Sequence, residues 1–394
     1  MRYPFRAAFI AAALVTVPAL EARADAVTDW NVRANEVVVE AKLGTPPAMR
    51  VMAIVQSAVL EAVDTAKAGT SIDAAVAAAN RAALSKLLPA QQASIDRAYQ
   101  AALAAIAETP AKAAGIAVGE RAAARILDAR ADDLAKPAPY RPHTTAGAYV
   151  PTAAPAAPHW GLRKPWLMTS ASQFRPAPPP ALGSALWVRD YNEVKLLGAK
   201  ASAARTPEQT EIAQFWEYSL PPIYHGVVRS VAAMPGRNVA QNARLFAAAS
   251  QAMDDALIAV FDAKYHYNFW RPVTAIRNGD IDGNPATERD AAWTAFHDSP
   301  MHPEYPSGHA ILAGAVGAVL EAELGGTHAP VLATSSPSAK NITRRWTSVT
   351  DFVQEVSDAR IYEGIHFRTA VEIGTAMGRQ IGDLAAKKYV LSPY

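Results

Sequence analysis

The chain contains no cysteine among its 394 residues. This absence excludes a disulfide framework, a thiolate nucleophile, a Cys-ligated zinc site and an iron–sulfur cluster. Any catalytic chemistry must therefore use His, carboxylate, Lys, Arg or Ser side chains, or a metal held by nitrogen and oxygen atoms.

The net charge of the chain is also small, because the two signs of charge nearly balance. Lys and Arg number 38 against 36 Asp and Glu, and no run of five or more basic residues occurs, which disfavours a nucleic-acid-binding protein. Beyond residue 24, no segment reaches about 18 apolar residues without a charge, so we expect no stable membrane insertion. A hydrophobic content of 51% still predicts a folded chain with a large core, in one large or two small domains.

The first 24 residues have the order of a secretory signal peptide. Arg2 and Arg6 precede an apolar run over residues 7–17, and Ala22-Arg23-Ala24 forms an Ala-x-Ala cleavage motif. We therefore expect cleavage near Ala24 and a secreted or periplasmic protein.

The remaining chain is expected to be all-α. Residues 25–135 are rich in Ala and carry apolar residues at helical spacing, which predicts a smaller helical layer. Residues 136–183 hold 11 of the 29 prolines and predict an irregular connecting arm. Residues 184–394 predict a helical bundle, with long helices over 238–270 and 309–324 and a final pair within 350–386. No alternating β-branched run indicates a strand.

Three separated pieces of this bundle carry cations, histidines and a tight turn. Lys264 and Arg271 lie seven residues apart, which on one continuous helix places both on the same face. The second piece is Pro306-Ser307-Gly308-His309, in which Ser307 is a candidate N-cap and Gly308 lets the backbone approach a ligand. The third piece runs from Arg360 to His366 and contains a possible helix break at Gly364.

Together these pieces predict a site for a tetrahedral oxyanion. Lys264, Arg271 and Arg360 offer charge-assisted hydrogen bonds, and the start of a helix adds free N–H groups. One histidine can bond the central atom through a ring nitrogen, while the other transfers protons near neutral pH.

The order Lys-x6-Arg-Pro, then Pro-Ser-Gly-His, then Arg-x5-His resembles the vanadium-dependent haloperoxidase and type 2 phosphatidic acid phosphatase superfamily. The resemblance covers about residues 184–390. The secreted all-helical context, with Asp29-Trp30-Asn31 near the expected mature start, is similar to bacterial haloperoxidase-like members.

This resemblance implies a role for each site residue. Vanadate would be the cofactor, without haem or flavin, and His366 would be the apical ligand to vanadium. His309 would be the acid and base. The oxygens of vanadate would be held by Lys264, Arg271, Ser307, Gly308 and Arg360. The implied reaction oxidises a halide with hydrogen peroxide to hypohalous acid, which then acts on an organic acceptor, and vanadium serves as a Lewis acid.

His302 and Phe261 are further candidates, for a halide pocket. His302 lies seven residues before His309, at a position that carries His or an aromatic residue in the haloperoxidases. Phe261 lies one helical turn before Lys264 and is a candidate apolar wall.

Two alternatives remain open from the sequence. The same site in a secreted acid phosphatase would use His366 as the nucleophile on a phosphate ester, with His309 protonating the leaving group. A catalytically inactive periplasmic oxyanion-binding protein would keep the cradle without the reaction. The sequence does not indicate the oligomeric state.

The sequence also departs from the family pattern at two positions. Ala359 replaces the usual Ser before the third-block Arg, and Ala370 replaces the acid four residues after the last His. In the phosphatases that acid orients the nucleophilic histidine, so Ala370 disfavours the phosphatase. We considered Glu363 and Glu372 as substitutes for it.

Overall fold

The computed structural model describes residues 25–133, 140–326 and 328–390. The predicted signal peptide lies outside these residues. The first helices are α1 (Ala26–Glu40), α2 (Thr45–Thr65), α3 (Ile72–Leu87), α4 (Gln92–Ala104) and α5 (Pro110–Ala129). The second group comprises α6 (Ala185–Leu197), α7 (Pro207–Trp216), α8 (Pro221–Ala232), α9 (Val239–Tyr267), α10 (Pro272–Arg277), α11 (Gly308–Leu324), α12 (Val349–Tyr362) and α13 (Arg368–Tyr389).

Several helices begin at the residues that the sequence indicates. The side chains of Ser71 and Thr109 accept hydrogen bonds from backbone N–H groups in the first turns of α3 and α5. Thr206 and Gln209 form a reciprocal capping box at the start of α7. These caps satisfy N–H groups that have no partner inside the helix, which explains why the helix starts are readable from local sequence.

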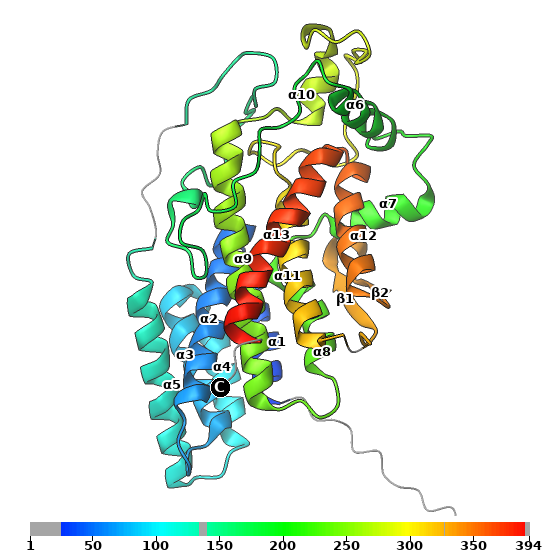
Figure 1. Cartoon of the computed structure of the whole chain (residues 1–394). Coiled ribbons are helices and arrows are strands. Elements are labelled where there is room, and N and C mark those ends of the chain that lie inside the picture. The colour runs from blue at the N-terminus through cyan, green and yellow to red at the C-terminus, as the bar shows by residue number, and fades with distance from the viewer. Residues whose placement is uncertain (1–24, 134–139, 327, 391–394) are drawn as a thin grey trace, which may run out of the picture.

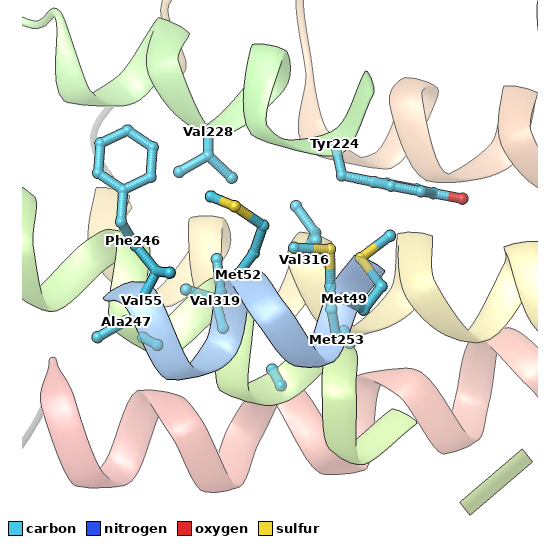
Figure 2. Packing of buried hydrophobic residues seen from close by; sticks show 14 of the residues in the cluster. Met49, Met52, Val55, Tyr224, Val228, Phe246, Ala247, Met253, Val316 and Val319 are labelled. Atoms are coloured by element: carbon cyan, nitrogen blue, oxygen red, sulfur yellow. The ribbon is translucent and has the colours of Figure 1, made fainter. Parts of the chain in front are cut away.

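One continuous core joins the two groups of helices. Met49, Met52 and Val55 of α2 meet side chains of α8, α9 and α11 in the close view of Figure 2. The facing side chains labelled there are Tyr224, Val228, Phe246, Ala247, Met253, Val316 and Val319. The first helical layer is therefore held on the bundle through α2 (Figure 1).

Helices α11 and α13 pack with their backbones almost in contact. A Cβ atom added at Gly314, Gly378 or Gly382 would lie 2.1–2.4 Å from a backbone carbonyl oxygen of the facing helix. No side chain fits at these distances, so glycine is required for this close approach. The packing fixes the start of α11, where Ser307, Gly308 and His309 lie.

The structure contains one short hairpin that the sequence analysis missed. Strands β1 (Leu332–Ser336) and β2 (Ile342–Trp346) pair antiparallel, from Leu332 opposite Trp346 to Ser336 opposite Ile342. Lys340 and Asn341 take positive φ in the connection. Each strand has only five residues, too few for a clear alternation, and the pair depends on packing against α8 for its stability.

The proline-rich segment lies along the outside of α9 (Figure 1). Its described residues, 140–183, form no helix or strand apart from a short 3₁₀ turn at Trp160–Leu162, as the proline content predicts. Among the described residues, no helix is long and apolar enough to cross a membrane.

Candidate active site

Three segments of the bundle converge on one site. They are the end of α9 with its turn into α10, the loop that leads into α11, and the turn between α12 and α13. Lys264, Arg271, Arg360, Ser307 and His366 are all at most 2% exposed. Gly308, His309 and His302 are partly exposed and form the open side of the site.

Lys264 and Arg271 do not share a helix face, which corrects the sequence prediction. α9 ends at Tyr267, and Asn268 takes a left-handed conformation (φ 51°, ψ 41°) that closes the helix. Arg271 then stands at the N-cap of α10 with an extended backbone. The two cations come together through the turn that ends α9 and leads into α10, not because of helical spacing.

The connecting arm supports this turn. Tyr149 N–H donates to the Asn268 carbonyl, and Trp270 N–H donates to the Gly147 carbonyl, at 2.8 and 2.9 Å. Ala148 and Phe269 form the bridge between these bonds. The arm therefore helps to place Arg271.

The two cations grip the loop before α11 through its carbonyl groups. Lys264 Nζ donates to the carbonyls of Pro303 and Glu304 at 2.9 and 2.8 Å. Arg271 Nε donates to the His302 carbonyl at 3.0 Å, and its Nη1 donates to the Ile365 carbonyl at 2.8 Å. Arg271 thereby ties this loop to the turn that carries His366.

Arg360 is held at the end of α12 by two acceptors. Its Nη1 donates to the Trp216 carbonyl at 2.8 Å and forms a short ion pair with the Glu363 carboxylate. Its Nε has no partner among the residues that the structure describes. Glu363 also faces the His297 ring, with Oε2 3.5 Å from Nδ1.

Ser307 and Gly308 open α11 toward the site. Ser307 is the N-cap, and its N–H donates to the Ala370 carbonyl at 2.9 Å. A Cβ added at Gly308 would meet no atom within 4 Å, so open space lies beside this backbone. Residue 370 therefore orients Ser307 through its backbone carbonyl, although its side chain is Ala rather than the acid of the family pattern.

Glu304 is the site residue that the sequence analysis missed. It is fully buried, and its Oε1 accepts from His366 Nδ1 at 2.7 Å and from Phe367 N–H at 2.9 Å. Because Oε1 accepts both bonds, we assign the His366 proton to Nδ1 and the lone pair to Nε2. Nε2 lies 3.3 Å from Arg271 Nη1, on the cationic side of the ring.

Neither substitute considered from the sequence orients His366. Glu363 pairs with Arg360, and Glu372 lies 3.6 Å from Arg189 on the surface. Glu304 stands two residues after His302, and its only sequence signal was this position between two site blocks. The contact joins residues 62 positions apart, which local patterns do not reveal.

His309, His302 and Phe261 line the open side. His309 Nε2 is buried without a partner in the described part of the chain. His302 Nδ1 contacts Arg271 Nη2 at 2.9 Å, and the Phe261 ring lies edge-on to the His302 ring with centroids 5.2 Å apart. Of the two residues assigned to a halide pocket, His302 therefore contacts Arg271, and Phe261 packs against His302.

The electrostatics of the site favour an anion. Burial, reinforced by Arg271, lowers the pKa of Lys264 well below its ordinary value, and burial lowers the pKa of Arg271 to about 10. Burial raises the pKa of Glu304 to about 8, against the opposing pull of Lys264 and Arg271. A bound oxyanion would stabilise the protonated cations by direct attraction.

The histidines are held neutral by the same surroundings. Protein atoms packed around the rings lower the pKa of His302, His309 and His366 well below 6.5, although His302 and His309 keep part of their surface open. The nearby cations lower each pKa further. A neutral His366 keeps the Nε2 lone pair that a bond to a metal or to phosphorus requires.

The residues fit a tetrahedral oxyanion. The carboxylates of Glu304 and Glu363 lie beside the three cations. Arg360 Nε and His309 Nε2 are unpaired donors or acceptors within the described residues, and the space beside Gly308 is open. A bound oxyanion would offer a hydrogen-bond partner to both atoms.

Three other histidines lie elsewhere. His225 is buried between α1, α8 and α9, where it contacts Asn35 Nδ2 at 3.0 Å and Ser250 Oγ at 3.1 Å. Asn31 joins the same buried group through Arg229, so Asp29-Trp30-Asn31 lies in a segment that anchors α1. His266 is exposed, and His297 reaches the site only through Glu363.

Comparison with known proteins identifies similar chains. A family model described as the VCPO second helical-bundle domain matches residues 244–391. Vanadium chloroperoxidase of Curvularia inaequalis is 30% identical over 211 residues, which cover 45% of this chain and 34% of that protein. The chain thus matches about a third of the length of that curated relative.

Solved structures share the fold over almost the whole chain. A bacterial vanadium-dependent iodoperoxidase is 24% identical with a TM-score of 0.77, covering 92% of this chain and 96% of its own. A holo-type bacterial vanadium-dependent chloroperoxidase is 21% identical with a TM-score of 0.67, covering 91% and 93%. The predicted all-helical fold is confirmed, and residues 244–391 match the second helical-bundle domain of the VCPO family model.

Proposed function

We propose that this protein is a vanadate-dependent haloperoxidase that oxidises a halide with hydrogen peroxide. The observation that carries the proposal is the orientation of His366. Its Nδ1–H is fixed by the buried Glu304 carboxyl, and its Nε2 lies 3.3 Å from Arg271 Nη1, with the charges of the buried Lys264 and Arg360 also acting on the ring. This is the arrangement expected for a nitrogen ligand to the central atom of an oxyanion.

The donor set suits vanadate. Lys264, Arg271 and Arg360 would hold its oxygens, with the Ser307 hydroxyl and the Gly308 N–H at the start of α11. His366 Nε2 would be the ligand to vanadium. When bound, vanadate supplies a Lewis acid that activates hydrogen peroxide for attack by a halide.

His309 is the proposed proton carrier. Its Nε2 is unpaired in the described structure, and its ring stays neutral at pH 7 because burial and the three cations lower its pKa. A neutral imidazole can accept a proton from hydrogen peroxide and later return it. Its place in the first turn of α11 fixes it beside Gly308.

A phosphatase is the second candidate, and one observation favours it. The reservation drawn from Ala370 no longer applies, because Glu304 supplies a carboxyl that orients His366. The same Nε2 lone pair would serve as a nucleophile on a phosphate ester, forming a phosphohistidine.

A paired assay separates these functions. Protein purified without phosphate is loaded with orthovanadate and tested for bromide- and iodide-dependent halogenation with hydrogen peroxide. The vanadate-free sample is tested for p-nitrophenyl phosphate hydrolysis. Halogenation that requires vanadate and is lost in His366→Ala supports the haloperoxidase.

Hydrolysis that vanadate inhibits, without halogenation, refutes the haloperoxidase in favour of the phosphatase. If both activities are absent while vanadate still binds, the protein is an oxyanion-binding protein. We further propose export, on the signal-peptide pattern of residues 1–24. N-terminal sequencing of secreted protein tests this, with a mature start near residue 25 as the expected result.

A further inference from the structure

The connecting arm is held against α9 by several buried hydrogen bonds and ion pairs. Arg163 makes two bonds to the buried Asp254 carboxylate, at 2.7 and 3.1 Å. The Asp255 carboxylate accepts three consecutive backbone N–H groups, from residues 166–168 of the arm. Figure 1 shows this segment beside α9. These buried bonds hold the arm in one position.

A second clamp lies nearer the site. Arg175 pairs with Asp262 through two bonds of 2.8 and 2.7 Å, in a bidentate geometry. Tyr265 Oη donates to the Ala156 carbonyl at 2.5 Å. At Gly161 a Cβ would lie 2.7 Å from the Asp262 backbone, so glycine lets the arm touch α9 there. Residues 156, 161 and 175 of the arm therefore all contact the last turns of α9, and a small space lies between these contacts.

That space is a cavity of about 230 Å³ between the arm and α9. Leu162, Phe261 and Tyr265 supply its apolar walls, and Arg175, Asp262 and His266 supply polar groups. Leu162 is 65% exposed and lies at the rim of this cavity. Because both walls are clamped, the cavity is formed before any ligand binds.

Phe261 is shared between this cavity and the oxyanion site. Its ring stacks on Tyr265 at 6.3 Å inside the cavity and meets His302 edge-on at 5.2 Å on the other side. His302 in turn contacts Arg271. One aromatic side chain thus separates the cavity from the residues that would hold the oxyanion.

We propose that this cavity binds the organic acceptor of the reaction, a small phenol. Leu162 and the rings of Phe261 and Tyr265 offer apolar contacts to one aromatic ring, and the polar groups offer partners for its hydroxyl. The proposal rests on the proposed haloperoxidase function, since hypohalous acid is the reagent that the acceptor consumes. The ring electrons attack the halogen, a carbon–halogen bond forms and the oxygen–halogen bond breaks. The ring proton and the hydroxide leave together as water.

Binding is tested first without vanadate, so that the result does not depend on activity. Saturation-transfer NMR and calorimetry with 4-methylphenol measure its dissociation constant on the purified protein. Leu162→Trp fills the rim of the cavity and is expected to weaken binding at least fivefold. The matched control is Leu196→Trp, at another leucine that is 60% exposed, on α6. Absence of phenol binding, or equal binding by both variants and the native protein, overturns the proposal.

Activity supplies a second measurement. If the haloperoxidase function holds, Leu162→Trp should lower phenol halogenation relative to halide oxidation measured without phenol, compared with the Leu196→Trp control. An unchanged ratio shows that hypohalous acid reacts in solution and refutes the acceptor site. If no halogenation occurs while phenol binding depends on Leu162, the proposed function fails but the phenol site remains.

Discussion

Replacing Glu304 by Gln tests whether the negative charge of Glu304 strengthens the bond that His366 would make to vanadate. Glutamine keeps the shape of the side chain and an oxygen acceptor for His366 Nδ1 and Phe367 N–H. The second carboxyl oxygen, Oε2, has no hydrogen-bond partner in the described structure, so an amide there disrupts no bond. Glu304→Gln therefore removes only the ability to carry a negative charge.

The expected size of the effect depends on pH. Burial raises the pKa of Glu304 to about 8, so the carboxyl is mostly neutral at pH 6 and mostly ionised at pH 9. An ionised acceptor strengthens a hydrogen bond from roughly 1 to roughly 2 kcal/mol or more and increases the basicity of His366. Loss of a hydrogen-bond partner that orients a metal ligand typically lowers the affinity for the metal about 10- to 100-fold. We expect little effect at pH 6 and this loss at pH 9.

A competing effect must be separated from this one. The negative charge on Glu304 also repels any bound oxyanion, by about 2 kcal/mol at roughly 8 Å and an effective dielectric constant of about 20. That repulsion is nearly the same for phosphate and vanadate, because both change from a monoanion to a dianion between pH 6 and pH 9, whereas only vanadate would bond to His366 as a metal. The quantity to measure is therefore the preference for vanadate over inorganic phosphate.

Isothermal titration calorimetry with both anions at pH 6 and pH 9 gives that preference. Glu304→Gln should reduce it 10- to 100-fold at pH 9 only. Glu363→Gln is the matched control, because Glu363 contacts Arg360 and not His366, and it should alter both affinities alike. An unchanged preference at pH 9, or an equal loss at both pH values, would refute the assigned role of Glu304.

Three further predictions concern proton transfer, acid stability and packing. His309→Ala should leave the vanadate dissociation constant within about threefold but lower turnover at least 100-fold, because general acid–base catalysis typically contributes that much; calorimetry and a halogenation assay check this, and normal turnover contradicts it. Burial lowers the pKa of His225 to about 3 in the folded protein. Below about pH 6.5, His225 is therefore protonated in the unfolded chain but stays neutral in the folded protein. Stability is therefore lost as pH falls, and between pH 6.5 and 4.5 the loss in His225→Gln should be smaller by roughly 2–3 kcal/mol in urea unfolding; parallel curves contradict this. Gly378→Ala places a Cβ 2.1 Å from the Ile311 carbonyl and should cost about 1–3 kcal/mol. Gly183→Ala, where a Cβ meets nothing within 4 Å, should be nearly neutral in the same unfolding measurement.

Local chemistry explains which parts of the fold were predictable. The caps at Ser71, Thr109 and Thr206 and the break at Gly364 depend on residues within a few positions of one another. The hairpin at β1 and β2 was missed because its strands are short and are stabilised by packing against α8.

The prediction that Lys264 and Arg271 lie close together was correct, but the reason given for it was wrong. Helical spacing predicted that Lys264 and Arg271 lie together, but α9 ends between them at Asn268. A single left-handed residue, Asn268, ends the helix, and the arm at Gly147 and Tyr149 is hydrogen-bonded to the turn that follows. Helix termination of this kind depends on distant contacts as well as on local propensity.

The identity and order of the three cations, the two histidines and the Ser-Gly turn are present in the linear chain, and they were sufficient to predict an oxyanion site. The partner of His366 was not, because Glu304 reaches it across 62 residues of intervening chain. The clamped arm and the cavity beside Phe261 likewise exist only after residues 156–175 fold onto α9. Side-chain chemistry is a property of each residue, whereas the burial, orientation and neighbours that tune it arise when distant segments pack together.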